Sequence, residues 1–386
     1  MKKIEETTLD KICFITDGSH FSPKEADDDY LMVSVRDFTS YGFDFSSCKR
    51  ISGLDYEKLV LGGCVPEKGD ILIGKDGARC FEDIIIYRQD ERPALLSSIA
   101  IIRCTDKSTI PEYIYYYLKV PNVHDDIREN YVSGSAIPRI VLKDFRRLPI
   151  FLPDIEYQRK VVDTLECLDK KIQINEKENQ KLEELAQSTY QLCFCNKDKI
   201  AGETCSLGDV TTQITERLGK KKAVVLSAVN KGILQPSDDY FSKQVYSKKT
   251  DKYIIVSEWD FAYNPARINI GSIGINDLGY VGCVSPVYVV FRVDPEYRAF
   301  FRFYFRSEAF RQECITRASG SVRQTLNYAE FSHIEITYPR RELAAKFEAE
   351  WKTIRTKIDV NTRENDKLKQ MRDLMIRRLI PVKEQQ

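Results

Sequence analysis

The chain has 386 residues, 42% of them hydrophobic, so it is long enough for two or three domains and is not globally disordered. It carries 59 Lys and Arg against 58 Asp and Glu, and this net charge of +1 excludes a strongly basic, free-standing nucleic-acid binder. A binder whose basic surface is local or shared with a partner is not excluded. The N-terminal residues form no apolar signal segment, every apolar run is too short for a bilayer, and the eleven cysteines include no CxxC pair. We therefore expect a cytoplasmic protein without membrane contacts.

The first 153 residues are predicted to form a mixed α/β domain. Short β-branched runs between glycine-containing turns indicate strands at 70–73 and 99–102. The aromatic run 113–118 has helical spacing, which is more typical of a core helix than of a base-stacking platform. Equivalent runs predict a second domain over 201–339, with strands at 253–256 and 287–290 and a helix at 300–305.

An internal repeat links these two domains. The segment SGSAIPRIVLKDFRRLPIFLPD (133–154) has a counterpart in SGSVRQTLNYAEFSHIEITYPR (319–340), with Gly134 aligned to Gly320 at an offset of 186 residues. This offset continues without a gap as far as Leu182, whereas upstream it drifts between 184 and 198 residues, as loop insertions would cause. One unit of about 190 residues therefore occurs twice, which indicates a tandem duplication rather than a solenoid.

The C-terminal part of each repeat, in which the offset stays constant, is predicted to be one long helix. Neither Gly nor Pro occurs in 154–201 or 340–380, and both segments are rich in Glu, Lys, Gln and Leu. We predict spacer helices within 154–200 and 340–386. A helix of about 38 residues would be roughly 57 Å long, which is the length of a spacer rather than of a typical globular-domain helix.

Both predicted helices carry a seam with heptad-like steps of three and four residues, so we expect them to pack on each other. The seam residues are Leu165, Leu168, Ile172, Asn175, Asn179 and Leu182 in the first copy, and Ile354, Ile358, Asn361, Asn365 and Leu368 in the second. Two consecutive seam positions in each copy are Asn, which is costly when buried and usually fixes register and partner choice. The alternative is that the seam opens there and the Asn side chains are hydrated.

No catalytic motif is found in the chain. A GxxxxGK[ST] loop is missing, and the three histidines are too dispersed for a triad or a metal site. Asp154 and the Asp169-Lys-Lys sequence formally fit a nuclease pattern, but they are about 22 Å apart along one predicted helix, whereas that chemistry needs adjacent carboxylates. The segment 264–267 (NPAR) lacks the second proline and the aromatic residue of an adenine-methyltransferase loop. We therefore expect a protein that is not an enzyme and holds no metal.

The repeated unit resembles the target-recognition domain of type I restriction–modification specificity subunits. The resemblance is carried in the second copy by KYIIVSEWDFAYNPARINIGSIGINDLGYVGCVSPVYVVFRVD (252–294), and in the first by PEKGDILIGKDG (66–77), LSSIAIIR (96–103) and PEYIYYYL (111–118). It covers residues from about 8 to 380 in the order domain, helix, domain, helix. The chain departs from the pattern of this family at two points: Arg372 occupies a seam position, and the second helix begins without the usual Gln.

The resemblance implies an α+β fold with two mixed α/β target-recognition domains, related by duplication and separated by two long antiparallel coiled-coil helices. It implies a non-catalytic subunit that binds double-stranded DNA and reads a bipartite site, with one half-site for each domain. The implied partners are two copies of a DNA adenine methyltransferase subunit and, in a full complex, restriction and translocase subunits. S-adenosylmethionine would then bind the methyltransferase, ATP and Mg²⁺ the restriction subunit, and this chain would hold no cofactor.

Candidate base-reading residues are polar side chains in glycine-flanked turns, because Arg and Lys pair with guanine, and Asn and Gln with adenine. They are Lys75, Arg79, Arg139, Lys220, Lys221, Lys222, Arg267, Asn269, Arg323 and Gln324. Each of them has the alternative of being a solvated loop residue. The two SGS segments also have the alternative of docking the helices, because they keep register with them.

Two other classes of function stay open at this point. In the first alternative, the chain is a coiled-coil scaffold that joins two protein-binding domains and does not bind DNA. In the second, it is a self-sufficient adenine methyltransferase. The scaffold predicts no salt-dependent DNA affinity, and the methyltransferase requires S-adenosylmethionine to bind this chain alone, for which the glycine-rich motif is missing.

Overall fold

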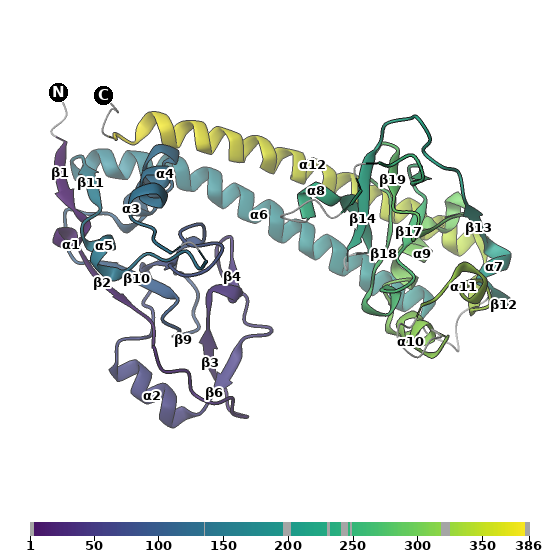
Figure 1. Cartoon of the computed structure of the whole chain (residues 1–386), viewed down its shortest axis with the longest axis horizontal. Helices are drawn as coiled ribbons and strands as arrows, with labels where there is room; N and C mark the ends of the chain where they lie inside the picture. Colours follow the sequence, from purple (N-terminus) through teal and green to yellow (C-terminus); the bar gives the residue numbers. More distant parts are fainter. Residues whose placement is uncertain are drawn as a thin grey trace. The chain divides into compact units, whose positions relative to one another are not determined.

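The computed structural model describes residues 4–134, 136–195, 202–229, 232–240, 246–247, 249–317 and 325–382. It contains two compact units: unit 1 comprises Met1–Asn175 with Arg363–Gln386, and unit 2 comprises Glu176–Thr362. Each unit therefore combines one globular part with one half of each long helix, α6 (Ile155–Phe194) and α12 (Arg341–Leu379) (Figure 1). The α+β class is confirmed, but the units do not follow the linear order of the four predicted segments.

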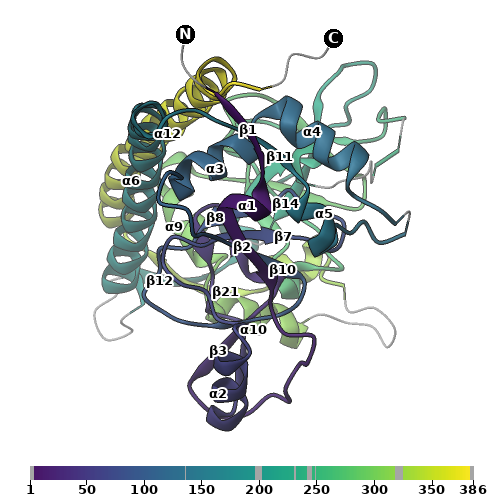
Figure 2. The ribbon, with the colours of Figure 1, turned by 90° about the vertical axis from the view of Figure 1, so that its left-hand side faces the viewer.

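Unit 1 is built on a four-stranded antiparallel sheet in the order β2-β10-β7-β8, visible face-on in Figure 2. These strands are β2 (Cys13–Asp17), β7 (Ile71–Gly74), β8 (Ile84–Ile86) and β10 (Ile99–Cys104). The ladder of β1 (Glu5–Thr8) with β11 (Pro149–Leu152) joins the two ends of the globular part. The helices are α1 (Leu9–Ile12), α3 (Pro111–Leu118), α4 (Pro121–Asn130) and α5 (Leu142–Arg146).

A smaller lobe of unit 1 lies away from the four-stranded sheet (Figure 2). It contains β3 (Tyr30–Val33), β6 (Lys49–Ile51), β9 (Ala94–Leu95) and α2 (Gly53–Leu61). The hairpin of β4 (Phe38–Thr39) and β5 (Gly42–Phe43) lies next to it in the chain.

Unit 2 repeats this plan and then extends it. The order β13-β20-β17-β18 matches β2-β10-β7-β8, and the ladder β12-β21 matches β1-β11. In unit 2 the sheet continues through β15-β14-β19-β16, so that it has eight strands. The strands are β12 (Gly202–Ser206), β13 (Thr211–Ile214), β14 (Val224–Val229), β15 (Ile233–Pro236), β16 (Ile254–Val256), β17 (Phe261–Tyr263), β18 (Ile273–Ile275), β19 (Gly282–Val284), β20 (Val289–Val293) and β21 (Glu335–Pro339). The helices are α7 (Leu207–Val210), α8 (Ser237–Tyr240), α9 (Arg298–Tyr304), α10 (Glu308–Arg317) and α11 (Tyr328–Ser332).

The aromatic helices form core packing, as predicted. All residues from Tyr113 to Leu118 of α3 are buried. In α9, Phe303 is 1% exposed and packs edge-on against Trp351 of α12, with ring centroids 5.2 Å apart. Their rings are therefore used to attach each sheet to the long helices rather than to stack on bases.

Each sheet contains the same buried ion pair. Asp70 accepts two hydrogen bonds of 2.8 Å from Arg103, and Asp260 accepts two of 2.6 and 3.0 Å from Arg292. Both carboxylates are at most 1% exposed. Such bidentate pairs are strong and directional, so in each copy the carboxylate ties the start of one strand to its neighbour.

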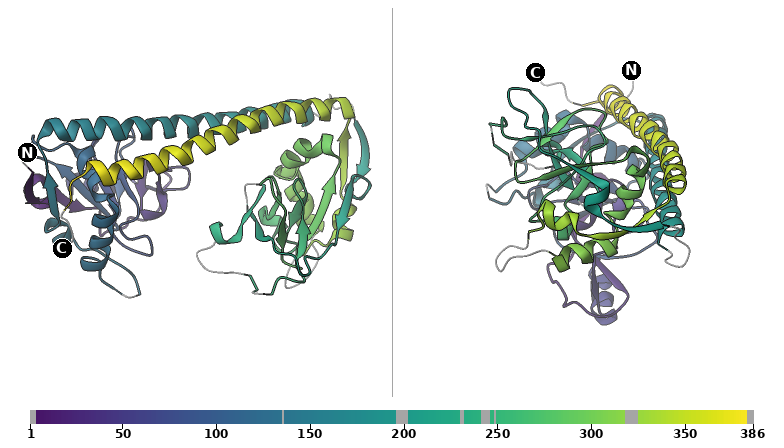
Figure 3. Two further views of the ribbon diagram at one scale, coloured as in Figure 1. Left: turned by 90° about the horizontal axis from the view of Figure 1, so that it is seen from above. Right: turned by 90° about the vertical axis from the view of Figure 1, so that its right-hand side faces the viewer.

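Within each unit, α6 and α12 pack antiparallel (Figure 3). In unit 1 the Asn175 amide donates to the Asn365 Oδ1 at 2.8 Å, and in unit 2 the Asn361 amide donates to the Asn179 Oδ1 at 2.8 Å. Asn175, Asn361 and Asn365 are at most 4% exposed. The Asn layers are therefore hydrogen-bonded across the seam and closed to solvent at Asn175, Asn361 and Asn365, rather than open and hydrated as in the alternative. Among the other seam residues, Leu165 and Ile172 are buried, and the remainder are half-buried: Leu168, Asn179, Leu182, Ile354, Ile358 and Leu368.

The two Asn layers are copies of each other. Asn175 also donates to Glu364, which pairs with Lys171. At the positions 186 residues away, Asn361 donates to Glu178, which pairs with Lys357. The duplication thus preserved a complete hydrogen-bonded layer in each unit.

Candidate nucleic-acid interface

In unit 1 the predicted base-reading residues lie on two segments that the fold brings together. Lys75 and Arg79 are in the loop after β7, and Arg139 follows the first SGS motif. The Ile140 N–H donates to the Lys75 carbonyl at 3.0 Å, and Asp76 forms a β-bridge with Arg139. The SGS segment therefore contacts this loop directly, which the sequence register with the helices did not indicate.

Lys75 and Arg139 share one carboxylate. The Lys75 Nζ lies 3.2 Å from Asp76 and 3.4 Å from Asp17, and the Lys75 side chain is only 4% exposed. Arg139 donates through Nε to Asp76 at 2.7 Å while its side chain stays 55% exposed. Lys75 is thus used inside the domain as a counter-ion, and Arg139 is the member of the pair that faces solvent.

Arg79 is also exposed and oriented by a carboxylate. Its Nε donates to Asp83 at 2.9 Å, and this hydrogen bond raises the pKa of the guanidinium. Asp76 has the same effect on the pKa of Arg139. Both guanidinium groups stay charged and are held in place, which favours directional contacts with an acceptor such as guanine.

In unit 2 the equivalent loop follows β17. The Leu326 N–H donates to the Pro265 carbonyl at 3.1 Å, in the place of the bond between Ile140 and Lys75 in unit 1. Arg267 is exposed and precedes a short 3₁₀ helix at 268–270, in which Asn269 is half-buried.

The segment that pairs with this loop in unit 2 is described only from residue 325 onward. Arg323 and Gln324 lie outside the described residues. The Asn269 carbonyl accepts a hydrogen bond of 3.2 Å from Arg311 on α10, which ties the 3₁₀ helix to the rest of unit 2.

Lys220, Lys221 and Lys222 form a separate exposed turn. The Leu218 N–H donates to the Tyr253 carbonyl at 2.7 Å, which fixes the turn beside the edge strand β16. Lys221 is 3.1 Å from Glu216, and both side chains are well exposed. Mobile, solvated lysines of this kind suit phosphate contacts better than base readout.

Unit 1 also has a basic cleft that was not predicted from the sequence, at Arg36, Lys119, Lys369 and Arg372. Burial lowers the pKa of Lys119 to about 8. The available signal was position 369, where the second copy has Lys and the first copy has Glu183.

The described part of the chain shows neither a metal-binding cluster nor a membrane-spanning helix. Within the described ranges, no three His, Cys, Asp or Glu side chains are grouped so that they could hold a metal ion. No helix in the same part of the chain is long and apolar enough to span a bilayer.

Comparison with known proteins agrees with this architecture. Residues 1–184 match the family model of the type I restriction modification DNA specificity domain. The chain is 24% identical over 144 residues to the type I restriction enzyme HindI specificity subunit of Haemophilus influenzae, a match that spans 37% of this chain and only about a third (31%) of the relative.

Two solved structures are similar along nearly the whole chain. The type I restriction–modification S subunit from M. genitalium has a TM-score of 0.57 at 14% identity, with 99% of this chain and 97% of that chain covered. The HsdS subunit from Thermoanaerobacter tengcongensis has a TM-score of 0.36 at 15% identity, covering 98% of this chain and 96% of that chain. The first likeness shows a shared fold. Through the specificity domain matched by residues 1–184, the duplicated architecture and this shared fold, the chain is similar to type I restriction–modification specificity subunits.

Proposed function

We propose that this chain is the non-catalytic DNA-reading subunit of a type I restriction–modification complex, in which each target-recognition domain reads one half of a bipartite site. The observation that carries the proposal is the duplicated loop pair. In both units the loop after the third sheet strand is hydrogen-bonded to the segment after the SGS motif, and both loops carry an exposed Arg, Arg79 or Arg267. Two equivalent loop pairs on one chain, one in each unit, suit a DNA site with two halves.

We further propose that two copies of an adenine methyltransferase subunit dock on the long helices. The exposed apolar residues Ile174 and Met371 in unit 1 have counterparts at an offset of 186 residues in Val360 and Leu185 of unit 2. All four are 49–60% exposed. Exposed apolar side chains that recur in both copies are consistent with two equivalent contacts for one kind of partner.

These partners would also explain the neutral net charge. A methyltransferase that encloses the duplex supplies phosphate contacts, so this chain contributes mainly base readout. S-adenosylmethionine would bind the methyltransferase, which flips the adenine, and ATP and Mg²⁺ would bind a restriction subunit where one is present.

The test is to co-express the chain with the methyltransferase encoded next to it and to map methylated adenines across the host DNA. We expect a bipartite motif that disappears when this chain is deleted, and a swap of residues 1–150 for another front domain should change only one half of it. Unchanged methylation without the chain would contradict the proposal and favour the protein scaffold.

A further inference from the structure

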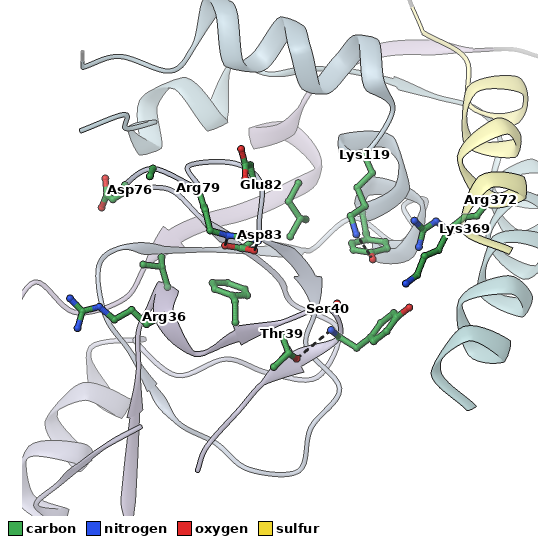
Figure 4. A pocket seen from close by; sticks show the side chains of 17 residues that line it. Arg36, Thr39, Ser40, Asp76, Arg79, Glu82, Asp83, Lys119, Lys369 and Arg372 are labelled. Carbon is green, nitrogen blue, oxygen red and sulfur yellow. Dashed lines mark hydrogen bonds and ion pairs between the residues drawn. The ribbon is translucent and has the colours of Figure 1, made fainter. Parts of the chain in front are cut away.

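Unit 1 contains a polar cleft of about 740 Å³ beside the long helix α12 (Figure 4). Its walls are the loop after β7, the β4-β5 hairpin, the end of α3 and α12. Five cations line it against three carboxylates: Arg36, Arg79, Lys119, Lys369 and Arg372 against Asp76, Glu82 and Asp83. The cleft is thus lined by an excess of positive charge.

The three carboxylates of the cleft are already engaged by other cations. Asp76 pairs with Arg139, Asp83 with Arg79, and Glu82 with Arg128 at 2.9 Å. None of them forms an ion pair with Lys119.

Lys119 makes no ion pair with any described residue. Its Nζ donates to the Tyr115 hydroxyl at 2.7 Å and lies 4.3 Å from the centre of that ring. Burial, and to a smaller extent the charge of Arg372, lowers the pKa of Lys119 to about 8, although Asp169, Asp373 and Asp83 act in the opposite direction. A partly desolvated ammonium without a counter-ion is stabilised by a bound anion.

A comparison of the two copies shows that the equivalent positions 183 and 369 on the long helices carry opposite charges. In unit 2, Glu183 on α6 lies 3.8 Å from Arg302 and 3.5 Å from Arg306 of the aromatic helix, so the arginines there have a carboxylate partner. The position 186 residues later is Lys369, on the α12 side of the unit 1 cleft. A carboxylate in one copy is thus a cation in the other.

We propose that this cleft binds a phosphate group at the end lined by Lys119 and Lys369, which lies away from Arg36 in the view of Figure 4. The phosphate belongs either to the backbone of bound DNA, a source that rests on the proposed function, or to a small phosphorylated molecule. In both cases the ammonium groups supply charge-assisted hydrogen bonds to its oxygens.

The first arm of the test is calorimetric titration of the full-length chain with inorganic phosphate. We expect saturable binding that is at least tenfold weaker in Lys119→Met and in Lys369→Glu, which installs the carboxylate of unit 2. Lys107→Met, an exposed lysine of unit 1 outside the cleft, should bind like the wild type. Thermal melts followed by circular dichroism check folding, and Lys369→Met replaces Lys369→Glu if the latter does not fold.

The second arm measures DNA affinity against salt in the presence of the methyltransferase partner. Loss of one phosphate contact reduces the slope of log K against log salt by about 0.9. A reduced slope in Lys119→Met identifies the DNA backbone as the source, and an unchanged slope with lost phosphate binding identifies a small molecule. If neither the phosphate affinity nor the slope changes in these variants, the proposal is overturned. A wild-type complex that binds no DNA contradicts the proposed function, whereas the phosphate titration still decides whether the cleft is an anion site.

Discussion

The buried Asn layer of unit 1 makes a quantitative prediction for the substitution Asn175→Leu. The change removes the donor to the Asn365 Oδ1, and Asn365 is only 4% exposed, so its oxygen cannot be rehydrated. An unsatisfied buried acceptor costs about 1–3 kcal/mol, and the lost hydrogen bond contributes about 1 kcal/mol more. Because Leu adds apolar burial, we expect unit 1 to lose about 2–3 kcal/mol of unfolding free energy.

The double variant Asn175→Leu/Asn365→Leu should be much less damaging. Replacing both partners with apolar side chains leaves neither Asn amide behind, so its stability should lie within about 1 kcal/mol of the wild type. The double-mutant cycle should therefore give a coupling energy of about 2 kcal/mol.

Unit 2 supplies the matched control. The same cycle on Asn361 and Asn179 removes an identical bond of 2.8 Å, but Asn179 is half-buried, so its freed oxygen can be hydrated. We expect the cost of Asn361→Leu to be about 1 kcal/mol smaller than that of Asn175→Leu.

The assay is urea unfolding of the full-length chain with two probes. Both tryptophans, Trp259 and Trp351, lie in unit 2, so their fluorescence follows that unit, whereas far-UV circular dichroism follows both. Additive single substitutions in unit 1, with a coupling below about 0.5 kcal/mol, would refute the dry hydrogen-bonded layer.

Four further predictions concern the ion pairs, the reading loop, the cleft and the helices. Asp260→Ala should lower the unfolding free energy of unit 2 by about 2–3 kcal/mol in urea melts, since the paired arginine is half-exposed and can be partly resolvated. Arg267→Ala should weaken cognate DNA binding by about 1–3 kcal/mol in a gel-shift assay, and unchanged affinity in a folded variant would exclude a base contact. Sulfate affinity of the cleft should fall as the pH rises through 8, because Lys119 is protonated below that pKa and neutral above it; a flat profile from pH 6.5 to 9.5 would contradict this. Ile174→Asp and Val360→Asp should each remove one of two methyltransferase copies in mass measurements of the complex, and full occupancy in both variants would exclude these docking points.

Much of the architecture could be predicted from the sequence because it depends on local pattern and on repetition. Both long helices follow from segments without Gly or Pro, and the strands at 70–73 and 253–256 correspond closely to β7 and β16, whereas the strand at 287–290 overlaps only the first two residues of β20. The different extension of the two sheets could not be predicted. In unit 1 the strands β3, β6 and β9 form a separate sheet, whereas in unit 2 the strands β14, β15, β16 and β19 extend the main sheet. Which of the two occurs depends on tertiary packing at the sheet edge.

The candidate site was only partly predictable for the same reason. The residue types around Lys75 indicated a polar turn, but the burial of Lys75 depends on Asp17, which is distant in the sequence and adjacent only in the fold. The cleft depends on α12 returning to α3, so that Lys119 and Lys369 line the same cavity although they are distant in the sequence. A comparison of position 369, which is Lys, with its counterpart Glu183 in the first copy could have pointed to it, but the sequence analysis did not include that comparison.

The interleaving of the two units sets an order for their completion on the ribosome. Unit 2 is a continuous segment, Glu176–Thr362, so all of its residues are synthesised before the segment that completes unit 1. Unit 1 needs Ile376 and Ile380 of the last segment in its core, and Tyr157 donates a hydrogen bond to the Leu379 carbonyl. The globular part that is synthesised first is therefore completed only by residues that follow the whole of unit 2, and until then its half of α6 lacks the apolar partners that α12 supplies.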